Sequence, residues 1–249
     1  MLSKSSLIYQ IKKYSGIAII RITEAILSLF DNRDWFDKNE FGFTKILEEN
    51  APEIRREFLA VQSKCAIPNM ETVFPEQIQI TGDNNWKTFW LIIYGYDLVE
   101  HLEGCPVTSK CLDKIPGITT AMFSVLEPLK NIPPHRGIYK GVLRCHLSLI
   151  VHDPDKCSMT VNGKSRHWQE GQCMFFDDTF IHSAVNNSTQ KRVVLFIDFL
   201  RRYPFPLNYI NYFIFNQIAK SEYIGEVLVN SAALDGVNYK PRKVNYLHV

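Results

Sequence analysis

The chain has 249 residues, of which 46% are hydrophobic and 22% charged, so its apolar content suffices for a sizeable core and excludes intrinsic disorder. With 28 Lys and Arg against 26 Asp and Glu, the formal net charge is +2. This balance gives no reason to expect a nucleic-acid partner, because phosphate binding calls for a strongly basic face. The six cysteines form no C-x-x-C pair, and we expect reduced, mostly buried thiols in a cytosolic compartment rather than a disulfide framework.

The first predicted element is an amphipathic helix in the apolar stretch Gly16–Phe30. Charged residues interrupt this stretch, so neither a signal peptide nor a membrane-spanning helix is expected. Helical periodicity places four large apolar residues on one face: Ile19, Ile22, Ile26 and Leu29. Two interpretations stay open. That face packs on the domain, or it lies in a membrane interface where the preceding lysines (Lys4, Lys12 and Lys13) meet anionic headgroups.

Residues 1–115 as a whole are predicted to be mainly helix and loop, a helical support within the same domain as the rest of the chain. A helix begins at Ala51, with proline in its first turn, and continues to Gln62. The segment Trp86–Tyr94 is aromatic and apolar and leads into a turn at Gly95.

From Ile118 the hydrophobic pattern changes to period two, which predicts strands. Turn residues separate them, and Asn162-Gly163 is a strong hairpin signal. Many short strands without intervening helices indicate an antiparallel sandwich or jelly roll in residues 116–204. The predicted strands are 119–127, 142–151, 158–161, 165–168, 172–177, 183–185 and 192–199.

Residues 205–249 form an aromatic C-terminal tail after Arg201-Arg202. Tyrosine and phenylalanine next to basic residues suit a membrane interface, and they also suit a helix that covers one end of a core. Together the two ends, residues 4–30 and 203–218, make peripheral membrane contact an expectation of the sequence.

Alternation along two of the strands places polar side chains on a single face. Arg144, His146 and Ser148 share one face of their strand, and Arg192 and Asp198 share one face of theirs. Arginine binds carboxylates with two parallel hydrogen bonds, so the pattern suits an anionic small molecule. Surface or salt-bridged arginines would explain the spacing equally well.

Five of the seven histidines lie between residues 135 and 182, namely His135, His146, His152, His167 and His182. Neutral imidazole is a common ligand of iron, zinc and copper, although a lone histidine is more often an ordinary polar residue. We expect ordinary roles for His152, beside a turn, and for His167, beside Trp168.

Five motifs stand out in the second half of the chain: Pro134–Gly137, Leu143–Leu147, Trp168–Gly171, Phe176–His182 and Arg192–Asp198. With them the chain resembles the aspartyl/asparaginyl β-hydroxylase family from about Trp86 to Pro204. Segments 86–95, 106–109 and 115–123 look most like the bacterial lipid A acyl-chain hydroxylases within that family. This resemblance implies a double-stranded β-helix fold and an Fe(II)- and 2-oxoglutarate-dependent dioxygenase. The substrate would be a lipid A acyl chain or an Asp or Asn side chain in a peptide or protein.

The resemblance also implies roles for individual residues. His135 and His182 would be the iron ligands, and Asp178 would orient a water molecule or a histidine. Many iron oxygenases carry a carboxylate two positions after the first histidine, where this chain has Gly137, as the family does. The remaining roles concern 2-oxoglutarate: Arg192 and Ser124 would bind a carboxylate, Arg144 and His146 would meet its other polar end, and Trp86 would wall the pocket.

Two other functions remain compatible with the sequence. One is a non-catalytic jelly-roll module that binds a ligand or metal, and the other is a cupin-like metalloenzyme that does not use 2-oxoglutarate. For localisation we expect the cytoplasm, with the cytoplasmic face of a membrane as the place of any peripheral contact.

Overall fold

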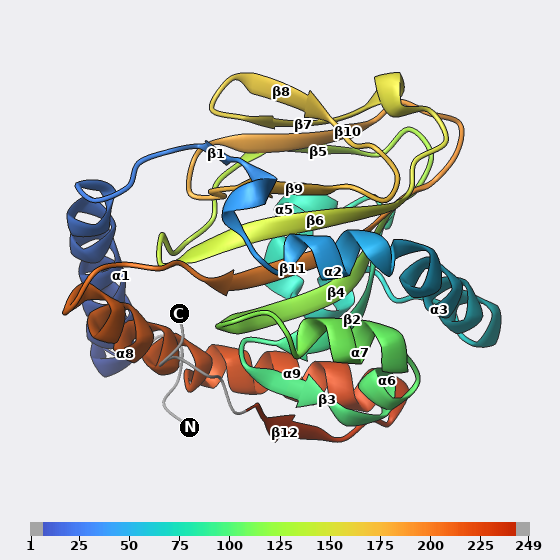
Figure 1. Cartoon of the computed structure of the whole chain (residues 1–249). Helices are drawn as coiled ribbons and strands as arrows, with labels where there is room; N and C mark the ends of the chain where they lie inside the picture. Colours follow the sequence, from blue (N-terminus) through green and yellow to red (C-terminus); the bar gives the residue numbers. More distant parts are fainter. Residues whose placement is uncertain (1–6, 243–249) are drawn as a thin grey trace.

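Two β-sheets face each other, and helices cover the outer surface of the larger sheet (Figure 1). The computed structural model describes residues 7–242. The strand order is β1-β9-β6-β11-β4-β2-β3-β12 in the larger sheet and β5-β10-β7-β8 in the smaller one. The strand pairs of the two sheets are antiparallel. The predicted fold class, mainly β with a cupin-like jelly roll and helices in the N-terminal part, is confirmed.

The larger sheet contains β1 (Trp35–Phe36), β2 (Trp86–Ile93), β3 (Tyr96–Leu98), β4 (Ile118–Leu126), β6 (Val142–Ile150), β9 (Cys173–Phe176), β11 (Arg192–Leu200) and β12 (Tyr239–Pro241). The smaller sheet contains β5 (Asn131–His135), β7 (Cys157–Val161), β8 (Lys164–His167) and β10 (His182–Asn186). The α-helices are α1 (Leu7–Ser28), α2 (Thr44–Glu49), α3 (Ala51–Lys64), α4 (Met70–Val73), α5 (Ile78–Thr81), α6 (Val99–Glu103), α7 (Pro106–Leu112), α8 (Leu207–Ala219) and α9 (Glu222–Asp235). Short 3-10 turns lie at Lys38–Glu40, Pro75–Gln77 and Pro154–Lys156.

The seven strands predicted from period-two patterning are present with bounds shifted by at most one residue. The predicted hairpin joins β7 to β8 through Asn162 and Gly163, whose φ angles of 51° and 74° are those of a type I′ turn. The helix predicted to begin at Ala51 is α3.

The structure differs from the sequence prediction at β2, which pairs with β4 deep in the larger sheet instead of belonging to a helical region. Its residues are buried on both faces, so the apolar run Trp86–Ile93 carries no alternation that would mark it as a strand. Strand β5 was not predicted either, because Pro133 and Pro134 lie within it. It forms the edge of the smaller sheet, where proline is tolerated.

Two hydrophobic clusters lie on the two faces of the larger sheet. The outer cluster joins alternate residues of β6, such as Leu143 and Cys145, to helices α2, α3, α6 and α7. The inner cluster fills the space between the sheets with residues such as Trp168, Phe176 and Phe196. His146 contacts these three inner rings, with centroid separations of 5.1–6.1 Å. The predicted alternation along β6 is therefore confirmed.

Helix α1 presents its predicted apolar face to the outside rather than to the domain. Ile22 is 62% exposed and Leu29, just beyond the helix, is 84% exposed, whereas Thr23 and Leu27 are buried. The structure thus excludes the interpretation in which this face packs on the domain. Side chains of residues 4–15, including the three lysines, lie outside the described part of the chain.

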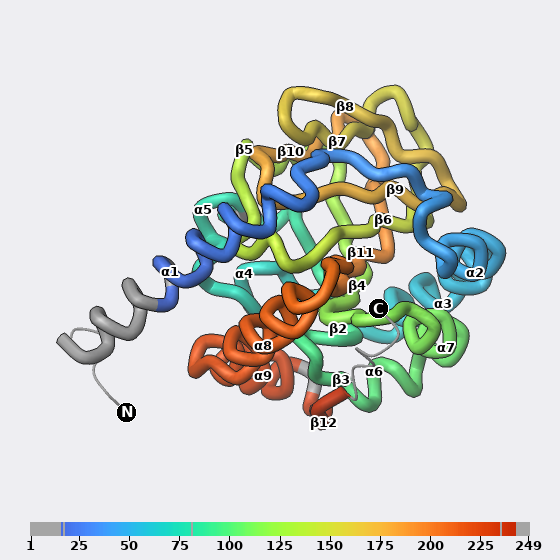
Figure 2. The backbone as a smooth tube through the Cα atoms, turned by 60° about the vertical axis from the view of Figure 1, so that its left-hand side comes forward, coloured from blue at the N-terminus to red at the C-terminus, as the bar shows by residue number. Residues whose placement is uncertain are grey.

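Helix α8 lies beside α1, as Figure 2 shows, and Ile20 of α1 packs against the small cluster formed by α8 and the end of β11. Among the helices of residues 7–242, none is long and apolar enough to cross a membrane. All six cysteines fall within this range and are thiols, and five of them are buried, as predicted.

Candidate active site

The two predicted metal ligands lie on neighbouring strands of the smaller sheet. His135 ends β5 and His182 begins β10, and they are direct partners in the strand register, with ring centroids 4.1 Å apart. Each Nδ1 lies at hydrogen-bond distance from the carbonyl oxygen two residues earlier, 2.9 Å for His135 and 3.0 Å for His182. A carbonyl can only accept, so each Nδ1 carries the proton and each Nε2 keeps the lone pair that a metal needs.

The surroundings of this histidine pair favour its neutral form. Burial lowers the pKa of His182 to about 3, and the charges of His135 and Arg144 act in the same direction. Burial also lowers the pKa of His135. Both imidazoles are therefore ready to bind a cation near neutral pH. Within residues 7–242 the two histidines are not joined by a third His, Cys, Asp or Glu in a group that could hold a metal.

Asp178 occupies the space that a side chain at position 137 would take. A Cβ added to Gly137 would lie 2.2 Å from Oδ2 of Asp178, far inside van der Waals contact. The Gly137 amide donates a hydrogen bond of 2.7 Å to the Asp178 carbonyl, which holds the two loops together. Gly137 thus stands where many iron oxygenases have a carboxylate residue, and it has no side chain. The carboxylate of Asp178, from another loop, lies against it instead.

Arg144 joins Asp178 to a second carboxylate across the sheet. Its Nη2 lies 2.8 Å from Oδ2 of Asp178, and its Nε and Nη2 donate to Asp198 at 2.8 and 2.9 Å. Arg144 and Asp198 face each other in the register of β6 and β11. Burial alone would lower the pKa of Arg144, but these two carboxylates outweigh it and raise that pKa.

Burial changes the acidity of the Asp178 carboxyl group. Burial raises the pKa of the Asp178 carboxyl to about 7, while the neighbouring Arg144 guanidinium acts against this rise. Asp178 therefore differs from an ordinary surface aspartate and could exchange a proton near neutral pH.

Arg192 is a buried cation, and no carboxylate lies beside it among the described residues. The residue is 2% exposed, its guanidinium carbon lies 4.5 Å from the centre of the Trp168 ring, and its Nε and Nη1 have no hydrogen-bond partner in the same part of the chain. Burial lowers the pKa of this guanidinium to about 9. A buried cation of this kind is costly unless an anion completes the site.

Other unpaired polar atoms gather around Arg192. In the described structure both ring nitrogens of His146 and the indole nitrogen of Trp168 are buried without a partner, and burial holds the pKa of His146 well below its usual range. Ser124 lies on the adjacent strand β4 and accepts a hydrogen bond of 3.0 Å from the Trp86 indole. We call Arg192, His146, Trp168 and Ser124 the anion cluster.

The eight predicted site residues come from both sheets of the jelly roll: the histidine pair belongs to the smaller sheet, Asp178 precedes it in a loop, and the other five lie on strands of the larger sheet. The sequence analysis gave no functional role to Asp198 or to Trp168. Strand alternation placed Asp198 on the face of Arg192 but could not show that it opposes Arg144. The sequence offered one sign for Trp168: it directly follows His167, the last residue of the polar strand β8.

Comparison with known proteins agrees with this geometry. Residues 48–202 match the family model described as aspartyl/asparaginyl beta-hydroxylase. An ornithine lipid ester-linked acyl 2-hydroxylase of Rhizobium tropici is 39% identical over 197 residues, covering 78% of this chain and 70% of that protein. Human aspartyl/asparaginyl beta-hydroxylase is 28% identical over 172 residues, or 66% of this chain, but the match spans only 22% of the human protein.

Among solved structures, the cupin_2 domain of an XRE family transcriptional regulator from Enterobacter cloacae covers 47% of this chain and 99% of its own length, with 13% identity and a TM-score of 0.34. The family assignment rests on the sequence matches, and the range matched by the family model, residues 48–202, contains the positions of both histidines and both arginines of the site. The chain belongs to the aspartyl/asparaginyl β-hydroxylase family, a family of hydroxylases.

Proposed function

We propose that the protein is an Fe(II)- and 2-oxoglutarate-dependent dioxygenase that hydroxylates an acyl chain of a membrane lipid. The observation that carries the proposal is the anion cluster, because a buried Arg192 with no anionic partner among the described residues fits a carboxylate cosubstrate. Two neutral histidines with available Nε2 atoms, on the smaller sheet, fit a divalent iron.

The residues of the candidate site would have separate roles in this hydroxylation. Bound iron would supply the oxidising chemistry, activating dioxygen while 2-oxoglutarate is decarboxylated to succinate. Arg192, with Ser124 beside it, would bind one carboxylate of the cosubstrate, and His146 and Arg144 would meet its other polar end. Asp178, held between Gly137 and Arg144, would orient a water molecule or His135.

A lipid substrate is supported by one relative and by one surface. The Rhizobium tropici protein is named for hydroxylating the acyl chain of a lipid. In addition, neighbouring helices expose large apolar side chains, which suits a lipid surface. We call these residues the apolar face: Ile19, Ile22, Ile26 and Leu29 at α1, and Phe205, Tyr209, Ile210 and Phe213 at α8.

An ion pair links the helix that carries part of the apolar face to the proposed active site. Arg136, which directly follows the proposed ligand His135, forms an ion pair with Glu24 of α1. A bilayer contacted by α1 would therefore lie near the end of β5 that carries this ligand. We propose peripheral contact with the cytoplasmic face of a membrane, where basic residues such as Arg202 would meet anionic headgroups.

Replacement of Ile22 by glutamate tests this contact. We expect the fraction of protein that sediments with anionic phospholipid vesicles to fall, with the partition coefficient lower by at least about tenfold, because an apolar anchor becomes a charge. Leu59→Glu is the matched control, since Leu59 is also exposed but lies on α3, on the other side of the molecule in Figure 1. Equal sedimentation of both variants, or dimerisation through α1 in place of vesicle binding, would contradict the proposal.

The function itself is tested with purified protein, Fe(II), ascorbate and 2-oxoglutarate. We expect succinate to form in proportion to lipid, and mass spectrometry to find one added oxygen on an acyl chain of lipid A or an ornithine lipid. Peptides containing Asp and Asn test the second substrate class, which the name of the human relative supports. Ligand binding without any succinate would instead support the non-catalytic module. Turnover without 2-oxoglutarate would support a different cupin-like enzyme.

A further inference from the structure

Asp177 is a fully buried carboxylate at the start of the loop between β9 and β10. Its Oδ2 accepts hydrogen bonds from Lys140 Nζ at 2.7 Å and from Arg201 Nη1 at 2.6 Å. Its Oδ1 accepts from the amide and the hydroxyl of Thr179 at 3.0 and 2.5 Å. Four donors fill the acceptor sites of a carboxylate, so the chain itself satisfies Asp177 and no ligand is needed here.

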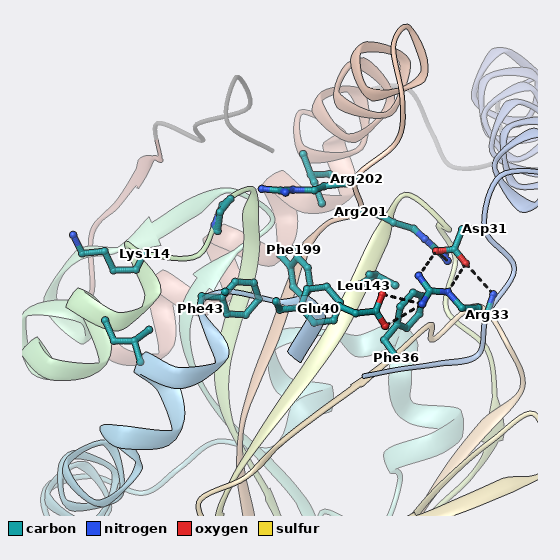
Figure 3. Close-up of a pocket in the computed structure, with 15 residues that line it drawn as sticks. Asp31, Arg33, Phe36, Glu40, Phe43, Lys114, Leu143, Phe199, Arg201 and Arg202 are labelled. Atoms are coloured by element: carbon teal, nitrogen blue, oxygen red, sulfur yellow. Dashed lines mark hydrogen bonds and ion pairs between the residues drawn. The ribbon is translucent and has the colours of Figure 1, made fainter. Parts of the chain in front are cut away.

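The charges of this buried network are balanced. Lys140 and Arg201 are both buried, and Arg201 also pairs with Asp31 at 3.0 Å (Figure 3). Two cations thus face two carboxylates, Asp177 and Asp31. Such a network adds little stability compared with apolar residues of the same volume, but it can select one arrangement of the segments that it joins. Those segments therefore show what the network can position.

The loop that begins at Asp177 leads to the proposed ligand His182. The contact of the Thr179 amide with Oδ1 of Asp177 closes a turn, and the Phe180 amide donates to the Asp177 carbonyl at 3.4 Å. The Phe180 carbonyl in turn lies 3.0 Å from Nδ1 of His182. The Asp177 side chain therefore holds the turn that supplies the carbonyl orienting the His182 ring.

The connection between β5 and β6, residues 136–141, directly follows the other proposed ligand, His135. It contains neither helix nor strand. It is held to the loop between β9 and β10 by the Gly137 amide, which donates to a carbonyl of that loop at 2.7 Å, and by Lys140, which donates to Asp177. These contacts link the segments beside the two proposed ligands.

We propose that Lys140 and Asp177 are positioning residues for the metal site, because their ion pair fixes the two imidazoles relative to each other. The strand register makes His135 and His182 partners, but His135 ends its strand and His182 begins its own. The ion pair fastens the irregular segments that continue from both strand ends. The inference rests on the proposed function, since it names residues that act through the proposed ligands.

The substitution Lys140→Met removes this ion pair and leaves Asp177 bound by Arg201 and Thr179. Methionine keeps much of the buried apolar stem of lysine, so we expect the variant to fold. The metal-free full chain is titrated with Co(II) and followed by its visible absorption. We expect Lys140→Met to bind Co(II) at least about tenfold more weakly than the unchanged protein. The absorption at saturating Co(II) should also change shape, because it reports the arrangement of the ligands around the metal.

Lys130→Met is the matched control. Lys130 is also buried, at 4% exposure, and binds Asp83 at 2.6 Å, but it precedes β5 at the end opposite to His135. The control therefore also removes the ion pair of a buried lysine with an aspartate. We expect it to keep the Co(II) affinity and spectrum of the unchanged protein, even where its unfolding temperature is lower. An equal loss of Co(II) affinity in both variants would show a general effect of stability and overturn the positioning role.

Thr179→Val replaces Lys140→Met if that variant does not fold. It removes the hydroxyl that donates to Oδ1 of Asp177 and keeps the shape of the side chain, so Co(II) binding should again weaken. Unchanged Co(II) affinity and spectrum in the folded variant would overturn the inference.

The variant His182→Ala, titrated in the same way, separates this inference from the proposed function. If Co(II) binds the unchanged protein and not His182→Ala, while Lys140→Met binds normally, only the positioning inference is wrong. If His182→Ala binds Co(II) as tightly as the unchanged protein does, the proposed metal site fails.

Discussion

Replacement of His182 by alanine is expected to reduce succinate formation by at least about a thousandfold, since a metal ion contributes several kcal/mol to the reaction it catalyses. His182 and His135 are direct partners in the register of β10 and β5, and each holds Nδ1 at a backbone carbonyl, which leaves Nε2 for a metal. Loss of either removes half of the protein's metal-binding atoms in this proposal. The anaerobic absorption band that Fe(II) and 2-oxoglutarate give together should also disappear, which separates loss of the metal complex from loss of later steps.

His152→Ala is the matched control for this experiment, because His152 belongs to the same cluster in sequence but is exposed and away from the site. We expect it to retain both the turnover and the absorption band. Since His182 is buried, circular dichroism must show that its alanine variant is folded. His135→Ala repeats the test at a half-buried position. Normal turnover in folded His135→Ala and His182→Ala proteins would show that the metal site lies elsewhere.

Strand β6 shows why much of the β-sheet could be predicted from the sequence. Leu143 and Cys145 face a core, and Arg144 and His146 face the interior site, so burial leaves a period of two in the residues themselves. Strand β2 has no such period, because both of its faces are buried. Its sequence therefore looks like that of any apolar segment. For α1, periodicity predicted the helix and its apolar face, but whether that face meets protein or solvent depends on what packs against it.

The site could be predicted where the resemblance supplied residue spacing, as for the two histidines and Arg192. Contacts that depend on the register between strands could not. Asp198 binds Arg144 because β6 and β11 place them opposite each other, a relation that no local pattern encodes. The contact of Gly137 with Asp178 likewise joins two loops that only the fold brings together.

Arg192→Met is expected to weaken cosubstrate binding without lowering the stability of the protein. A methionine keeps apolar volume against Trp168 and removes a buried cation that has no anionic partner among residues 7–242. The variant without cosubstrate should therefore unfold at the same temperature as the unchanged protein or a higher one. The KM for 2-oxoglutarate should rise by about a hundredfold or more, because a buried charge-assisted contact to a carboxylate is lost.

Thermal unfolding with and without 2-oxoglutarate measures both effects on the same sample. A ligand at 100 times its Kd stabilises the folded state by about 2.7 kcal/mol, so the unchanged protein should gain stability and Arg192→Met should gain none at the same concentration. Arg166→Met is the control, because Arg166 also lies over a tryptophan ring, 4.5 Å from the centre of Trp35, but on an exposed strand of the smaller sheet. It should leave the KM for 2-oxoglutarate unchanged. If Arg192→Met destabilised the protein and kept its affinity for 2-oxoglutarate, the guanidinium would be a structural element, and the carboxylate would have to bind at another cation.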